Sequence, residues 1–259
     1  MPWVRRVVAS PPVKSLAPAL RYLTIVPIPA GPHAEPTTLG RAAPWFPLIG
    51  LCVGVVIAAT ERVTAMLFPS LLDALLTVTV WKLVTGGMHL DGLSDYLDGL
   101  VGRDAGDRLR IMRDSRIGAF GAIGLILFLL LEVAAVSELP PATRWRVLLA
   151  APAVARAMPP LVSWFFPTAT PLGQGAMFRS GLRPSGVLAA FALAAVIALF
   201  TLHAVGLLVL GLAAGSATAL GWFSTRRLGG VTGDVLGACI EIAELLTLLT
   251  LVAWTHGLH

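Results

Sequence analysis

The sequence predicts an all-α integral membrane protein, a single bundle of about seven transmembrane helices with an interfacial helix before it and an acidic cytoplasmic helical segment within it. Two observations lead to this fold class. The composition is 56% hydrophobic and 13% charged, with a mean hydropathy of +0.83, which excludes most soluble enzymes. Several apolar runs also reach the roughly 20 residues that a helix needs to cross about 30 Å of hydrocarbon.

Residues 1–44 are expected to form a cytoplasmic and interfacial segment. Leucines recur at helical spacing over residues 13–25 against basic residues that include Arg21, which favours a helix lying in the membrane interface. Prolines at positions 27 and 29 are expected to end this helix.

Seven apolar runs are then predicted to cross the membrane. They cover residues 45–66, 71–88, 118–136, 147–166, 187–202, 204–223 and 235–254. The fifth and sixth runs are separated at His203, because one tilted helix cannot absorb the whole apolar stretch from 187 to 223.

The basic residues predict the orientation of these spans, because cytoplasmic loops carry an excess of Lys and Arg. With seven spans, 14 of the 19 basic residues fall on one side of the membrane. That side is predicted to be the cytoplasm and to hold the N-terminus, which leaves His256 and His259 on the opposite side. The net charge of +5 does not indicate nucleic acid as a partner, because no basic stripe is interleaved with aromatic residues. Membrane lipid is the expected surrounding.

The acidic residues are concentrated between the second and third predicted spans. Six of the 14 carboxylates lie within residues 91–114, so residues 89–117 form the candidate catalytic segment. Asp91, Asp95 and Asp98 are spaced by four and three residues, which places them on one face of a helix. Such like charges repel unless a cation lies among them, and Mg²⁺ takes carboxylate oxygens as ligands. The spacing therefore predicts a divalent metal site in preference to a solvated acidic face.

Residues 103–121, RDAGDRLRIMRDSRIGAFG, allow two interpretations. Their charges can form one alternating stripe on a salt-bridged, exposed helix, made of Arg103, Asp107, Arg110 and Asp114. Alternatively, Asp114 completes the metal site while Arg113 and Arg116 bind phosphate, whose oxygens match the guanidinium geometry.

A glycine-rich stretch, RRLGGVTGD at residues 226–234, precedes the last span. Its backbone amides and the N-terminus of the following helix are suited to binding an anion, or the stretch is only a flexible connection. Asp234 either serves the metal or caps that helix.

Charged residues also fall inside the predicted spans, where charge is expensive and usually paired. Glu241 and Glu244 in the last span are expected to form a buried structural ion pair with Arg156 or Lys82. His89 precedes the first aspartate of the cluster by two residues and is a candidate base, metal ligand or boundary residue.

These features favour transfer of a phosphate-linked group between two substrates, because carboxylates for a hard metal and arginines for phosphate occur without a Walker-type loop. No serine or cysteine has a recognisable activating partner in the sequence. Direct attack by a substrate hydroxyl is therefore favoured over a covalent enzyme intermediate.

Five segments resemble, in order, the adenosylcobinamide-GDP ribazoletransferase family, the cobalamin (5′-phosphate) synthases. They are RYLTIVPIP (21–29), WFPLIG (45–50), GGMHLDGLSDYLDGL (86–100), IMRDSRIGAFG (111–121) and LGGVTGDVLGACIEIAEL (228–245). The resemblance extends over most of the chain and is weakest over residues 140–220.

The resemblance implies a Mg²⁺-dependent transferase of the bacterial inner membrane. The family joins adenosylcobinamide-GDP to α-ribazole, or to α-ribazole 5′-phosphate, releases GMP and forms adenosylcobalamin or its 5′-phosphate. A ribazole hydroxyl would attack the phosphate attached to the corrinoid side chain. A homo-oligomer or a complex with other corrinoid-assembly enzymes is compatible with this function.

Carried over by residue, the resemblance implies that Asp91, Asp95 and Asp98 are metal ligands and, with His89, catalytic candidates. Asp114 is expected as a fourth metal carboxylate. The expected substrate contacts are Arg113, Ser115, Arg116, Thr232 and Asp234.

Two other classes are alternatives. Residues 95–99 resemble part of the CDP-alcohol phosphotransferase signature D-x2-D-G-x2-A-R of phospholipid synthases, but the Ala-Arg is absent here. A transporter would use Glu241, Glu244 and Arg156 along an ion path, which leaves the aspartate cluster unexplained.

Overall fold

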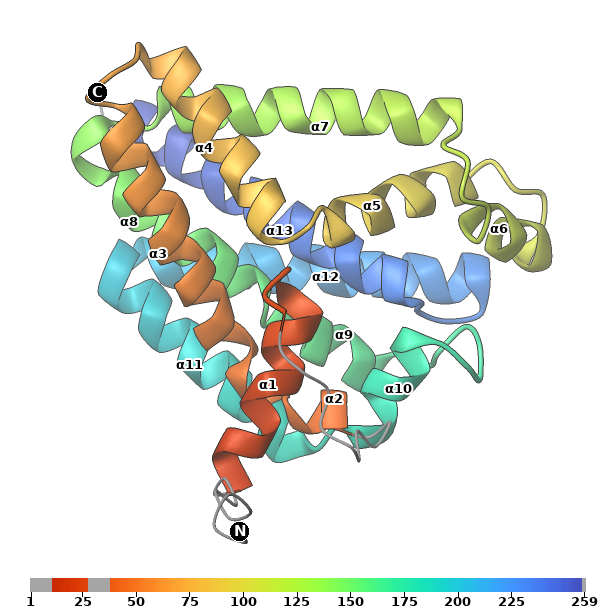
Figure 1. Ribbon diagram of the computed structural model, residues 1–259. Helices are drawn as coiled ribbons and strands as arrows, with labels where there is room; N and C mark the ends of the chain where they lie inside the picture. Colours follow the sequence, from red (N-terminus) through yellow and green to blue (C-terminus); the bar gives the residue numbers. More distant parts are fainter. Residues whose placement is uncertain (1–10, 28–37, 258–259) are drawn as a thin grey trace, which may run out of the picture.

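The computed structural model describes residues 11–27 and 38–257, and its regular elements there are helices apart from one isolated bridge between Thr168 and Val231. The helices are α1 (Pro11–Leu23), α2 (Thr38–Arg41), the 3-10 helix η1 (Ala43–Trp45), α3 (Phe46–Thr64), α4 (Ser70–Val84), α5 (Met88–Gly99), α6 (Ala105–Met112), α7 (Ala119–Glu138), α8 (Pro141–Ala155), α9 (Met158–Phe165), α10 (Gln174–Gly181), α11 (Pro184–Leu202), α12 (Val205–Leu228) and α13 (Gly233–His256). Figure 1 shows that they form one bundle, which confirms the all-α fold class. Parts of the predicted N-terminal segment (1–10 and 28–37) and His259 lie outside the described residues.

Six segments of the described chain are long and apolar enough to cross a membrane on their own: η1 with α3, α7, α8 with α9, α11, α12 and α13. α4 has only 15 residues and passes the same test only together with α5, from which a 90° bend separates it. The expected number of about seven is thus met by six spans and this bent pair. Because α5 carries three aspartates and turns away from α4, we place it outside the membrane-spanning segments.

The second predicted span is shorter than expected. It is predicted to reach residue 88, but α4 ends at Val84. Gly86 and Gly87 follow in the left-handed region, with φ of 65° and 64°, and they turn the chain into α5. Glycine takes this conformation without the steric cost that a Cβ atom brings.

The fourth predicted span is broken, whereas the division between the fifth and sixth is confirmed. The segment Pro141–Phe165 divides into α8 and α9, and two prolines stand at the start of α9, where they lack the amide that a continuous helix needs. α11 ends at Leu202, and His203 then adopts a positive φ of 57° before α12 begins.

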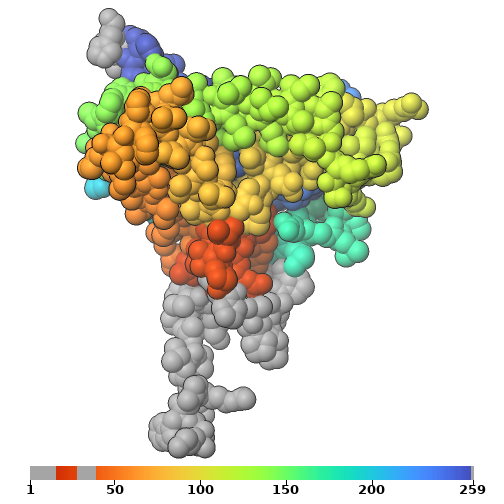
Figure 2. Space-filling view, turned by 45° about the horizontal axis from the view of Figure 1, so that its top comes forward, coloured from red at the N-terminus to blue at the C-terminus, as the bar shows by residue number. Residues whose placement is uncertain are grey.

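The helices differ in how much of their surface the bundle covers. The α8–α9 segment is the most enclosed, with 83% of its apolar window buried, whereas only 28% of the α7 window is buried. Ile123, Ile126 and Leu130 of α7 are each about 60% exposed. Figure 2 shows α7 in light green along the upper edge of the molecule. Contact of such an apolar surface with lipid has no free-energy cost, whereas its exposure to water is unfavourable.

The charges predicted inside the spans form one buried cluster. Lys82 Nζ lies 2.8 Å from Glu132 Oε1 and 2.5 Å from Glu241 Oε2, and Arg156 forms an ion pair with Glu244. This confirms the expected structural ion pair. Glu132 of α7 was not foreseen in it, because no spacing in the sequence relates α7 to α13.

Candidate active site

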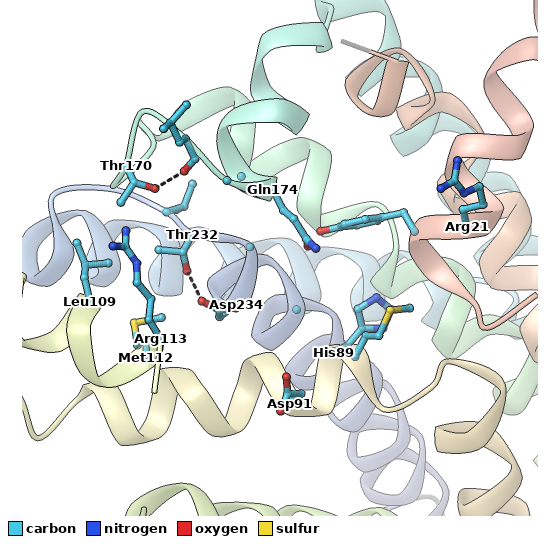
Figure 3. Close-up of a pocket in the computed structure, with 18 residues that line it drawn as sticks. Arg21, His89, Asp91, Leu109, Met112, Arg113, Thr170, Gln174, Thr232 and Asp234 are labelled. Atoms are coloured by element: carbon cyan, nitrogen blue, oxygen red, sulfur yellow. Dashed lines mark hydrogen bonds between the residues drawn. The ribbon is translucent and has the colours of Figure 1, made fainter. Parts of the chain in front are cut away.

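A cavity of about 400 Å³ opens between α1, α5, the end of α6, the loop before α10 and the start of α13 (Figure 3). Four of the five segments that carry the family resemblance contribute residues to its lining. The charged or titratable lining residues are Arg21, Tyr22, His89, Asp91, Arg113 and Asp234. The cavity therefore brings together sequence positions more than 200 residues apart.

The wall opposite α5 is a loop that is tied to the chain before α13. The amide of Ala169 donates to the carbonyl oxygen of Val231 at 3.0 Å, and the amide of Val231 donates to that of Pro167 at 2.8 Å. A Cβ atom on Gly230 would lie 2.5 Å from backbone atoms of this loop, so the close approach requires glycine. The glycine-rich stretch is thus a fixed part of the wall and not a flexible connection.

Arg226 and Arg227, the first two residues of the glycine-rich stretch, do not lie beside the start of α13 in the cavity. They belong to the last turn of α12, where their guanidinium groups lie 4.4 Å and 5.3 Å from the ring centroids of Trp222 and Phe223. Neither arginine belongs to the described lining of the cavity.

The start of α13 is capped by Thr232 and not by Asp234. Thr232 Oγ1 accepts a hydrogen bond from the amide of Val235 at 3.2 Å and donates one to Asp234 Oδ2 at 3.2 Å. Two roles were considered for Asp234, helix capping and metal binding. Thr232 provides the cap, so metal binding remains as the predicted role of Asp234. Asp234 and Asp91 stand on neighbouring helices in the cavity (Figure 3).

α5 and α13 cross in direct backbone contact, which brings their carboxylates together. A Cβ atom on Gly92 would lie 3.0 Å from the Cα of Asp234, and one on Gly237 would lie 3.2 Å from the Cα of His89. A side chain at either position would fit only if the neighbouring backbone moved by a few tenths of an ångström. The crossing places the α5 aspartates beside the first turn of α13.

Burial and electrostatic repulsion both disfavour the ionised form of Asp95 in this carboxylate cluster. Burial, together with the negative charges of Asp91, Asp234 and Asp98, raises the pKa of Asp95 to about 7. Within the described residues, no Lys or Arg nitrogen lies within 4.0 Å of any of these four carboxylates. A cation bound among them would remove this repulsion.

Asp98 has a structural contact that the spacing did not reveal. Its Oδ2 accepts a hydrogen bond from the amide of Gly118 at 2.7 Å and its Oδ1 from the amide of Gly121 at 2.8 Å, at the start of α7. The side chain is buried. Asp98 therefore holds α7 against α5, and its role as a metal ligand stays a prediction.

Of the four predicted site residues at positions 113–116, only Arg113 lines the cavity. Asp114 forms an ion pair with Arg116 at 2.6 Å, and the hydrogen bonds from Arg116 lower the pKa of Asp114 to about 2. Neither of these residues nor the exposed Ser115 is part of the described lining. Their predicted roles at metal and substrate stay predictions.

The alternating charge stripe is interrupted in the same region. α6 covers only Ala105–Met112, so Arg103 and Asp114 lie beyond its ends. Within the helix Asp107 and Arg110 pair at 2.6 Å, and Asp104 caps its start by accepting from the amide of Asp107.

His89 lines the cavity beside Asp91 but is closed off from solvent. It is 4% exposed, and neither ring nitrogen has a hydrogen-bond partner within the described part of the chain. Burial, with smaller contributions from Arg156 and Lys82, holds the pKa of His89 well below its usual range. The imidazole is therefore neutral near pH 7 and has a free acceptor nitrogen.

One set of three potential metal ligands in the described residues has its ligand atoms close together, and it lies in the buried ion cluster. One ligand atom each of Glu132, Glu241 and Glu244 lies within 4.8 Å of the others. The ammonium group of Lys82 lies within 4.0 Å of all three carboxylates and supplies the positive charge there. Within the described residues, no set of three that includes Asp91, Asp95, Asp98 or Asp234 meets the same distance criterion.

Several lining residues were not proposed from the sequence as site residues, among them Arg21, Tyr22 and Gln174. Arg21 and Tyr22 begin the segment RYLTIVPIP, so the family resemblance was the signal that could have identified them. Gln174 falls in the part of the chain where the resemblance is weakest, and no pattern marks it.

The comparisons with known proteins agree with the motifs. The family model of cobalamin-5-phosphate synthase matches residues 15–252. Curated proteins named adenosylcobinamide-GDP ribazoletransferase include one from Geotalea daltonii, 38% identical over 91% of this chain and 95% of its own length, and one from Roseiflexus sp., 38% identical over 93% and 90%. A third, from Herpetosiphon aurantiacus, is 36% identical over 93% of this chain and 97% of its own length. No solved structure matches. The resemblance read from the motifs is confirmed, and the chain belongs to the cobalamin-5-phosphate synthase family.

Proposed function

We propose that this chain is an adenosylcobinamide-GDP ribazoletransferase, the activity for which its relatives are named. It joins adenosylcobinamide-GDP to α-ribazole or α-ribazole 5′-phosphate, releases GMP and forms adenosylcobalamin or its 5′-phosphate. One structural observation supports the proposal in addition to the names of the relatives. A single cavity gathers residues from four family-like segments and holds carboxylates and two arginines without ion-pair partners in the described residues.

Mg²⁺ fits the donor set at the crossing of α5 and α13. Asp91, Asp95 and Asp234 would hold it, because all three supply hard oxygen ligands, and burial together with the neighbouring negative charges raises the pKa of Asp95. When bound, the ion would neutralise charge on the pyrophosphate and on the departing GMP. In this set Asp234 takes the place that the sequence gave to Asp114.

The side chains of the cavity supply the remaining functions. Arg113 binds oxygens of the pyrophosphate through charge-assisted hydrogen bonds. The ribazole hydroxyl oxygen forms a bond to the phosphorus next to the corrinoid, the bond from that phosphorus to the GMP oxygen breaks, and a ring nitrogen of neutral His89 accepts the hydroxyl proton. Burial of His89 keeps bulk water away from that nitrogen.

We place the cavity on the cytoplasmic face of a bacterial inner membrane. The support is the excess of Lys and Arg on the side of the acidic segment. This orientation gives the enzyme access to a nucleotide-linked substrate and to the Mg²⁺ of the cytoplasm.

Turnover by purified protein in liposomes tests the proposal. Adenosylcobinamide-GDP and α-ribazole 5′-phosphate are supplied with Mg²⁺ or with EDTA, and GMP and the corrinoid product are measured together. We expect both products only with Mg²⁺. Asp91→Asn should abolish turnover, whereas Asp107→Asn, a matched change in the same segment outside the cavity, should retain it. Equal activity of the Asp91 variant and the parent protein would contradict the metal site.

The same liposomes address the two alternative classes. The charges that a transporter would use, Glu241, Glu244 and Arg156, are engaged with one another and with Lys82. Uptake of labelled corrinoid without product would nevertheless support transport. Product from CDP-alcohol substrates in place of the corrinoid would support a phospholipid synthase.

A further inference from the structure

Two arginines stand at opposite ends of the cavity, with the carboxylates between them. Figure 3 shows Arg113 at one end, Arg21 at the other, and Asp91 and Asp234 in the middle. Neither arginine forms an ion pair with any residue that the structure describes. Arg116 and Arg110 nearby, in contrast, each pair with an aspartate. The cavity thus offers two separate guanidinium groups to anions.

The two arginines differ in their relation to the carboxylate cluster. Arg113 is among the charges that act on Asp234, so a phosphate bound to Arg113 lies beside the proposed metal ligands. Figure 3 shows Arg21 at the other end of the cavity, away from Asp91, Asp234 and Arg113. A phosphate bound to Arg21 would therefore lie farther from the carboxylates than one bound to Arg113.

Arg21 is held in place by the packing of its own helix. It lies in the last turn of α1, and the next residue, Tyr22, stacks on the rings of Phe46 and Phe178 with centroid separations of 5.9 and 6.4 Å. The amide of Ile25 just beyond donates to the carbonyl oxygen of Val84 in α4 at 3.0 Å. The backbone of Arg21 is thus fixed against the bundle, and its side chain reaches the cavity from a defined point.

The substrates of the proposed reaction bring one anionic group for each arginine. The inference about Arg21 therefore rests on the proposed transferase function. The corrinoid substrate brings a pyrophosphate, which must lie at the carboxylates because one of its phosphorus atoms reacts. One form of the acceptor brings a phosphomonoester that does not react. Two such anions repel each other, so binding both requires separate cationic contacts. We infer that Arg21 binds the 5′-phosphate of α-ribazole 5′-phosphate and sets the preference for the phosphorylated acceptor over free α-ribazole.

Turnover with each acceptor separately tests this assignment. Arg21→Ala should lower kcat/KM for α-ribazole 5′-phosphate by about 10- to 100-fold, as expected for one lost charge-assisted contact, and change that for α-ribazole less than about twofold. Arg21→Lys should recover part of the loss, because it keeps the charge but not the two-pronged geometry. Arg113→Ala should reduce turnover of both acceptors equally. Arg62→Ala, on the exposed face of α3 away from the cavity, is the control for removal of a positive charge.

An equal loss for both acceptors in Arg21→Ala would overturn the inference, and so would no loss for either. Wild-type protein that turns over neither acceptor would instead contradict the proposed function. Binding of α-ribazole 5′-phosphate and α-ribazole by calorimetry then still tests Arg21. Weaker binding of the phosphorylated compound alone in Arg21→Ala supports the assignment, and unchanged binding of both refutes it.

Discussion

Neutralising Asp95 should stabilise the metal-free protein while it removes activity. The pKa of Asp95 rises from 3.8 to about 7, a difference that corresponds to about 4 kcal/mol of unfavourable free energy for the ionised form. Because the side chain is only partly buried, screening by water reduces this to about 1–2 kcal/mol. Asp95→Asn removes the charge with little change in volume. For a chain of this size we expect its unfolding temperature to rise by about 2–8 °C in EDTA at pH 8.

The pH dependence of this gain has a definite sign. The folded protein holds the Asp95 proton more tightly than the unfolded chain, so this carboxyl group favours folding at acidic pH, and its contribution is lost as the pH rises through about 7. The advantage of the Asn variant should therefore be largest at pH 8 and decline toward zero as the pH falls to about 4.

Unfolding followed by tryptophan fluorescence in detergent, at pH 4 to 8 in EDTA and in Mg²⁺, measures this effect. Added Mg²⁺ should raise the unfolding temperature of the parent protein and raise that of Asp95→Asn much less, because ligand binding stabilises only a competent site. Asp107→Asn serves as the control, because its carboxylate is paired with Arg110 and lies outside the cavity. A lower unfolding temperature of Asp95→Asn than of the parent in EDTA at pH 8 would refute the repulsion argument.

Three further outcomes follow from the packing around the site. Asp98→Ala should destabilise the protein by about 1–3 kcal/mol in thermal unfolding, because two amides at the start of α7 lose their acceptor; an unchanged unfolding temperature would contradict this. Gly92→Ala should reduce kcat by forcing α5 away from Asp234, whereas Gly215→Ala in α12, where a Cβ atom meets nothing within 4 Å, should leave turnover unchanged; equal turnover of the two variants would disprove the close-contact argument. Lys82→Met should cost about 3–5 kcal/mol, because three buried glutamates lose their cation, and adding Glu241→Gln should recover part of the folded yield measured by size-exclusion chromatography.

The features that the sequence revealed were local ones. The break at His203 follows from the length of the apolar stretch, and the helical placement of Asp91, Asp95 and Asp98 follows from their spacing. The buried ion pair was predicted because basic residues are scarce in the apolar spans. A membrane helix tolerates a glutamate only near a positive charge, and the spans offered few such partners.

The features that the sequence did not reveal depend on where distant backbone lies. Whether Arg113 or Arg116 faces the cavity is decided by the end of α6 at Met112 and by the pairing of Arg116 with Asp114. The contact of Asp98 with the start of α7 depends on the turn of the intervening loop, since the two amides lie 20 and 23 residues further along the chain. No periodicity encodes such contacts, and only the family resemblance pointed toward Arg21.

The crossing of α5 and α13 also has a consequence for biosynthesis. Asp91 and Asp95 are translated early, but Asp234 belongs to the last helix of the bundle. The same is true of the central ion cluster, where Arg156 precedes its partner Glu244 of α13 by 88 residues. A nascent chain that lacks α13 therefore carries unbalanced charge in the membrane and an incomplete carboxylate cluster. Arrival of the final helix completes both, so the protein acquires its stable interior and its active site in the same step of assembly.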